Sequence, residues 1–71
     1  METITITTEF IRLQDLMKLG SIAASGGEAK QLIQDGQVRV NGEICLQRGR
    51  KLRPGDVGTY LGRDYTAAYA P

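Results

Sequence analysis

The segment from residue 37 to residue 46 constrains the fold of this chain more than any other. Val38 and Val40 alternate with polar neighbours, which is typical of a half-buried strand, and Asn41-Gly42 follows directly. Asn and Gly tolerate the positive φ angles of a type I′ turn, in which two residues join two antiparallel strands. Apolar residues then resume up to Leu46. The sequence therefore predicts a β-hairpin here.

Two short helices are expected before this hairpin. In the first, Leu13, Leu16 and Met17 recur at helical spacing, and Gly20 offers a C-terminal stop. This spacing predicts a helix of about two turns.

The second helix has clearer boundaries than the first. Ser25 stands where an N-cap is needed, and Glu28 follows three residues later in the capping-box arrangement. Gly36 is suited to close the helix in a left-handed conformation. The apolar stripe between these boundaries consists of Ala29, Leu32 and Ile33.

Strands are expected near both ends of the chain. Thr and Ile alternate over Thr3–Thr8, and a further strand is expected over Val57–Leu61, after a Pro-Gly turn within residues 52–56. Residues 63–71 have weak periodicity, and two interpretations stay open: a continued strand or a loose tail. The expected fold class is α+β, with two short helices packed on a small, mostly antiparallel sheet, in a single domain over residues 1–71.

The absence of histidine and the presence of only one cysteine exclude several kinds of site. An internal disulfide is impossible, and catalytic triads and zinc sites lack their usual residues, so no catalytic residue, metal or cofactor is expected. With 71 residues the core is thin, so no enclosed site for a small-molecule substrate is expected. The apolar runs are too short for a membrane span, and the unpaired thiol favours the cytoplasm.

Positive charge is concentrated in one loop. Residues 37–71 contain six of the nine Lys and Arg side chains but three of the eight acids. No acid occurs between Ile44 and Gly55, and this stretch holds four cations. The planar donor fork of Arg pairs bidentately with phosphate oxygens, so the loop is a candidate phosphate-binding site, although a solvated surface loop has the same pattern. Its cations are Arg48, Arg50, Lys51 and Arg53.

The start of the second helix is another candidate. Ser25, Gly26 and Gly27 lie where unpaired backbone N–H groups and the positive end of the helix dipole can receive a phosphate. Plain N-capping by Ser25 explains the same residues. Lys30 and Arg39 would extend the basic patch if the helix and the first hairpin strand share a face.

The remaining reactive or aromatic side chains favour structural roles. Cys45 lies between apolar neighbours, which favours a packed thiol over a nucleophile. Phe10 and Tyr60 are expected in the core, although aromatic side chains, Tyr65 and Tyr69 included, can also stack on unpaired bases.

Four segments, taken in this order, resemble one known family, the S-four-type RNA-binding domain, or α-L motif. That domain occurs in the fourth protein of the small ribosomal subunit, in bacterial pseudouridine synthases, in tyrosyl-tRNA synthetases and in small stand-alone, YbcJ-like bacterial proteins, which this chain resembles most. The resemblance covers about residues 10–60. The segments are Leu13–Gly20, Ser25–Ile33, Gly36–Gly42 and Gly49–Asp56.

The resemblance implies a non-catalytic module that presents its second helix, hairpin and basic loop to structured RNA. The implied partners are ribosomal RNA or tRNA, ribosomal particles included. Members often have Arg directly after the capping Ser, whereas this chain has Gly26 and Gly27 there, so one expected phosphate contact is missing. The implied contact residues are Ser25, Lys30, Arg39, Arg48, Arg50, Lys51 and Arg53.

Two other interpretations fit parts of the sequence. In the first, the basic loop docks on an acidic protein surface during ribosome assembly. In the second, Val40–Glu43 and Leu52–Asp56 belong to a β-grasp sulfur carrier, but such carriers need a terminal Gly-Gly and this chain ends Ala70-Pro71.

Overall fold

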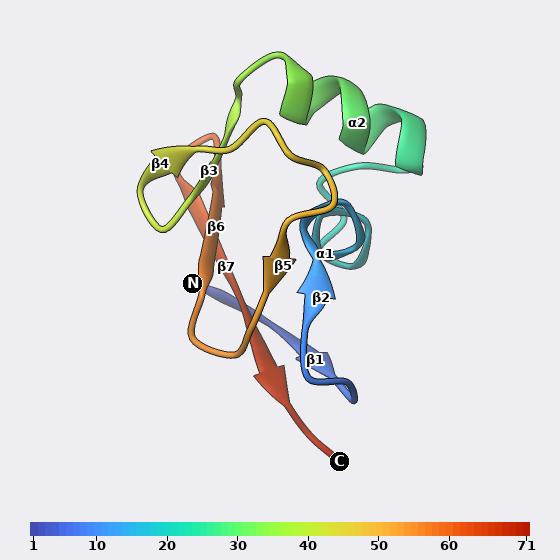
Figure 1. Ribbon diagram of the computed structural model, residues 1–71, viewed down its shortest axis with the longest axis vertical. Coiled ribbons are helices and arrows are strands. Elements are labelled where there is room, and N and C mark those ends of the chain that lie inside the picture. The colour runs from blue at the N-terminus through green and yellow to red at the C-terminus, as the bar shows by residue number, and fades with distance from the viewer.

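The computed structural model describes all 71 residues and contains two helices and seven strands, so the predicted α+β class is confirmed (Figure 1). A five-stranded sheet has the order β1-β7-β6-β3-β4, and β2 pairs with β5 in a separate two-stranded sheet. All strand pairs are antiparallel except β1 with β7. In chain order the elements are β1 (Glu2–Ile6), β2 (Ile11–Arg12), α1 (Leu13–Leu19), α2 (Gly26–Gln34), β3 (Val38–Val40), β4 (Glu43–Ile44), β5 (Lys51–Leu52), β6 (Val57–Tyr60) and β7 (Arg63–Tyr69).

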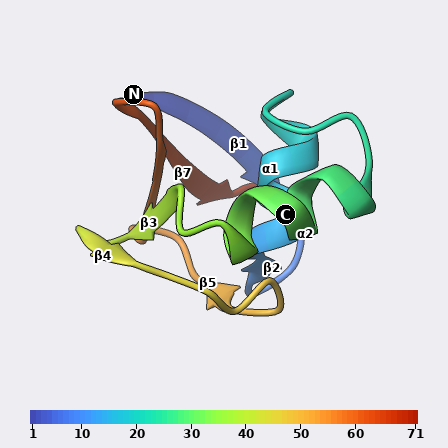
Figure 2. The same cartoon turned by 90° about the horizontal axis from the view of Figure 1, so that it is seen from above.

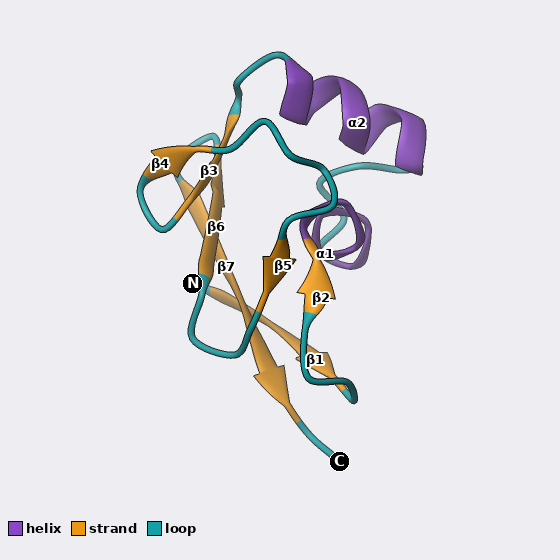
Figure 3. Cartoon of the chain, viewed as in Figure 1, coloured by secondary structure: helices purple, strands orange, loops and turns teal.

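Both helices lie on one side of the five-stranded sheet (Figures 2 and 3). The predicted caps of α2 are confirmed: the Ser25 hydroxyl accepts a hydrogen bond from the Glu28 N–H at 3.2 Å, and Gly36 has a φ of +74°. Helix α1 ends as expected, with Gly20 as its C-cap. Local residue signals therefore define both ends of α2 and the C-terminal end of α1.

The predicted hairpin is confirmed as β3 and β4, with Asn41 and Gly42 at φ angles of +51° and +88°. The expected extension of its second strand to Leu46 is wrong, because β4 ends at Ile44. Beyond that point the chain leaves β3 and crosses beside α2 towards α1 (Figures 1 and 2). The first predicted strand is also shorter than expected and ends at Ile6.

The segment that had two open interpretations, residues 63–71, forms β7 over Arg63–Tyr69. This strand lies between β1 and β6, and a two-residue turn with φ angles of +50° at Leu61 and +76° at Gly62 connects it to β6. Tyr65 and Ala67 point into the core from it. The interpretation as a loose tail is therefore wrong.

The core lies between the helices and the inner face of the sheet. Cys45 is buried, as expected, and Tyr60 packs partly against the core. Phe10 is half-buried and outside the core, contrary to expectation, because Ile11 takes the inward position of β2 and turns its neighbours outward. The largest fully buried side chains are Leu13, Leu16, Met17, Ile33, Leu52, Val38 and Val40.

Candidate nucleic-acid interface

The basic loop is attached to the start of α1 through its main chain. The N–H groups of Leu13 and Gln14 donate to the carbonyl oxygens of Arg50 (2.9 Å) and Arg48 (3.1 Å). The first N–H groups of a helix have no partner within the helix, and no side chain caps α1. The loop carbonyls take that role, so the loop is held in place while its Arg side chains stay exposed.

Strand pairing adds a cation that the sequence analysis missed. Arg12 lies opposite Lys51 in the register of β2 with β5, and Ile11 lies opposite Leu52. Ile11 and Leu52 are buried, so Arg12 and Lys51 share the outward face. Only the pairing of two short, distant strands brings Arg12 to the loop, and no local pattern around Arg12 indicates it.

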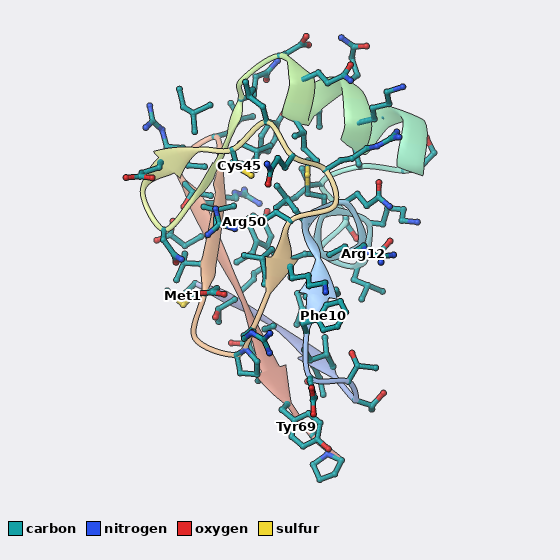
Figure 4. All side chains as sticks on the ribbon, viewed as in Figure 1. Met1, Phe10, Arg12, Cys45, Arg50 and Tyr69 are labelled. Carbon is teal, nitrogen blue, oxygen red and sulfur yellow. The ribbon has the colours of Figure 1, made fainter.

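Phe10 lies beside these two cations. The Lys51 Nζ atom is 4.8 Å from the centroid of the Phe10 ring, within the range of a cation–π interaction. Figure 4 shows Phe10 and Arg12 on the same side of the molecule, next to β2. An aromatic ring therefore lies beside these cations, although it is far from the loop in the sequence.

Arg53 begins the turn that follows β5. Its backbone N–H donates to Asp56 Oδ2 at 2.8 Å, and Asn41 Nδ2 donates to Asp56 Oδ1 at 3.1 Å. The hydrogen bond from Arg53, helped by that from Asn41 and by the charges of Arg50 and Arg53, lowers the pKa of Asp56 below its ordinary value. The Asp56 carboxylate thus accepts hydrogen bonds that stabilise the turn, and it forms no ion pair with a cation of the loop.

Eight of the nine cations have no carboxylate partner, since the one ion pair joins Lys18 to Asp15 at 3.4 Å. Five of these unpaired cations lie on or next to the β2–β5 sheet and are exposed. We call this group the basic surface. It consists of Arg12, Arg48, Arg50, Lys51 and Arg53.

The first turn of α2 is open to solvent. A Cβ atom built on Gly26 would meet no atom within 4 Å, and one on Gly27 would meet only Ser25 Oγ at 3.9 Å. Lys30 is exposed on the same helix. This turn is at the end of α2 remote from the hairpin (Figure 1), and no hydrogen bond or ion pair links it to the basic surface.

Arg39 lies on the other face of the sheet from the helices. Its neighbours Val38 and Val40 are buried against the core, so Arg39 points outward, where its guanidinium donates to the Gly42 carbonyl oxygen at 3.3 Å. The shared face that would join Arg39 to α2 is therefore not present.

The structure contains no metal-binding cluster and no membrane-spanning helix. No three acidic, His or Cys side chains are grouped as a metal ion would require. Neither helix has the length and apolar character needed to cross a membrane. The arrangement can bind an extended anion through exposed cations that are held on a fixed backbone.

Comparison with known proteins identifies the family of the chain. The model of the S4 domain family matches residues 4–67. A relative from Bacillus subtilis (strain 168), described as "Probable ribosome maturation protein RlbA", is 46% identical over 54 residues, which cover 76% of each chain. The residues matched by the family model include both helices and strands β2 to β6 in full. The chain therefore belongs to the S4 domain family.

Proposed function

We propose that this protein binds structured RNA through the basic surface and catalyses no reaction. The observation that supports this most directly is the set of five exposed cations without acidic partners. Four of them belong to the loop whose backbone is hydrogen-bonded to α1, and the fifth, Arg12, lies in β2 directly before α1. Phosphate oxygens are the natural partners of such a cluster, because Arg pairs with them bidentately. The ribosome maturation relative favours ribosomal RNA, within a ribosomal particle, over tRNA as the target. A ribosomal target would also favour the cytoplasm as the location of the protein.

The proposed recognition depends on shape rather than on sequence. A-form RNA hides its base edges in a deep groove, so a small basic surface contacts phosphates and 2′-hydroxyls. If about three to five phosphates are neutralised, the logarithm of the affinity falls with the logarithm of the salt concentration with a slope of about −2 to −4. Net charge contributes little, since the whole chain carries only +1.

Other residues form secondary contact regions in this proposal. Backbone N–H groups at Gly26 and Gly27, next to Ser25, would receive a phosphate, and Lys30 would reach a neighbouring one. The open space over both glycines supports this approach. Arg39, on the other sheet face, would contact a separate RNA segment.

A protein partner is the second candidate. Ile44 and Leu46 are 54% and 61% exposed just before the basic loop, and exposed apolar side chains favour protein contacts. In that case the loop would dock on an acidic surface of an assembling ribosomal particle.

The test is fluorescence anisotropy of a labelled, structured fragment of ribosomal RNA and of a tRNA, titrated with protein at several salt concentrations. The wild type should bind the ribosomal fragment with the stated salt slope, and the triple substitution of Arg50, Lys51 and Arg53 by Ala should weaken binding at least tenfold. Lys18→Ala serves as the control, because Lys18 already has a carboxylate partner. Unchanged RNA affinity in the triple variant, with loss of a protein partner, would favour the second candidate.

A further inference from the structure

A hollow of about 530 Å³ lies beside the basic surface, between the end of β1, β2 and α1. Phe10 and Arg12 line it, so the hollow begins where the basic surface ends. Its apolar walls include Ile11 and Leu19, and Leu19 is 60% exposed. The contacts proposed above with phosphates leave this space unused.

The hollow contains polar groups that can form hydrogen bonds with a nucleobase. Thr7 supplies a hydroxyl, and Asp15 supplies a carboxylate whose Oδ1 atom already faces Lys18 at 3.4 Å. A carboxylate accepts hydrogen bonds from the amino groups of bases. The Thr8 hydroxyl donates to the Phe10 carbonyl oxygen at 2.7 Å, which fixes the backbone at Phe10.

Two cations near the hollow favour a ligand that carries phosphate groups, as a nucleotide of RNA does. Arg12 lines the hollow, and Lys51 lies opposite Arg12 and 4.8 Å from the Phe10 ring. Two unpaired cations thus lie next to the hollow, Lys51 over the Phe10 ring and Arg12 in the wall, where they can bind the phosphates of a nucleotide held there. Stacking on aromatic rings, with Arg and Lys on the adjacent backbone, is how proteins bind unpaired nucleotides.

We propose that this hollow holds one unpaired nucleoside of the bound RNA, stacked on Phe10, with its flanking phosphates at Arg12 and Lys51. This proposal rests on the proposed RNA-binding function and adds a preference: RNA with a looped-out nucleotide next to a helix binds more tightly than a fully paired helix.

The test compares two labelled RNA hairpins that differ only by one bulged nucleotide. The wild type should bind the bulged hairpin about tenfold more tightly, which is within the range measured for one base stacked on an aromatic side chain. Phe10→Leu should lose this preference while it keeps the affinity for the paired hairpin. Tyr69→Leu is the matched control, because Tyr69 is an exposed aromatic residue outside the hollow and should keep the preference.

A second measurement needs no variant. Phe10 is the only phenylalanine of the chain, so its ring protons give an unambiguous NMR signal. The bulged hairpin should shift these signals strongly and the paired hairpin only weakly. Equal affinities for the two hairpins with equal Phe10 shifts would overturn the nucleoside site while leaving RNA binding intact. Failure to bind either hairpin at low salt would overturn the proposed function and the nucleoside site together.

Discussion

Asn41 and Asp56, fifteen residues apart, are joined by a hydrogen bond of 3.1 Å from Asn41 Nδ2 to Asp56 Oδ1. The Asn41 side-chain oxygen also accepts a hydrogen bond from the Val57 N–H at 2.9 Å. The backbone N–H of Asn41 donates to the Val57 carbonyl oxygen at 2.8 Å. The turn of the hairpin and the turn after β5 are thus one unit. Two of the four segments on which the family resemblance rests, Gly36–Gly42 and Gly49–Asp56, are therefore in contact.

Loss of the Asn41 side chain should destabilise the protein. Asn41→Ala leaves the Val57 N–H without its acceptor and puts a Cβ-bearing residue without a polar side chain at a φ of +51°. We expect a loss of about 1–3 kcal/mol in the free energy of unfolding, measured by urea denaturation. Asn41→Gly relieves the backbone strain but not the lost hydrogen bonds, so it should be intermediate. A loss below about 0.5 kcal/mol in Asn41→Ala would contradict this account.

Asp56 should make stability depend on pH in the acid range. Its pKa in the folded protein lies below the ordinary value of 3.8, mainly because its carboxylate accepts the Arg53 N–H. A lowered folded pKa gives stability that is present above the unfolded pKa and is lost as the pH falls through the folded pKa. Thermal melting of the wild type and of Asp56→Asn should therefore differ at neutral pH and converge below the folded pKa. A constant difference across the acid range would be inconsistent with the ionised role of Asp56.

Arg12 should contribute to RNA binding as much as a cation of the loop. Arg12→Ala removes one outward cation opposite Lys51 and no hydrogen bond of the fold, because the Arg12 side chain does not cap α1. The affinity for the ribosomal fragment should fall about threefold to tenfold, and the magnitude of the salt slope should drop by about one. Arg63→Ala, at the start of β7 and away from the β2–β5 sheet, is the control and should bind as the wild type does. Equal losses of RNA affinity in the two variants would show that affinity depends on the total charge and not on the position of Arg12.

Leu52 should stabilise the core from the same short strand that carries Lys51 of the basic surface. It is fully buried, while the adjacent Lys51 is exposed on the basic surface. Leu52→Ala should cost about 2–5 kcal/mol in the free energy of unfolding, as measured by denaturant titration. Ile44→Ala is the matched control, since Ile44 is 54% exposed, and should cost little. A small effect in Leu52→Ala would mean that β5 contributes little to the core.

The parts of the fold that were predicted from the sequence are those with local signals. Asn41-Gly42 defines a turn through backbone angles alone, and Ser25 with Glu28 defines a helix start within four residues. Strand β7 lacks such a signal, because Leu61 occupies the turn position that Asn usually takes and its partner β1 lies at the other end of the chain. Weak periodicity then leaves strand and tail equally consistent with the residues.

The same distinction applies to the candidate site. The four cations from Arg48 to Arg53 are adjacent in sequence, so composition alone identifies them. Arg12 and Phe10 join them only through the two-residue pairing of β2 with β5, for which the sequence has no period or turn signal. The alternation in Val38-Arg39-Val40 predicts that Arg39 lies on the opposite sheet face from the two Val residues. The sequence does not predict which of the two faces the helices cover.

The parallel pairing of β1 with β7 has a consequence for the order of folding during synthesis. Strand β1 is synthesised long before β7, with which it pairs. Strand β6 also pairs with β7, which lies between β1 and β6 in the sheet. Nascent chains that end before Arg63 therefore expose two unpaired strand edges, so truncated products should aggregate or be degraded. The five-stranded sheet can be completed only after β7 has left the ribosome, because β7 joins β1 to β6.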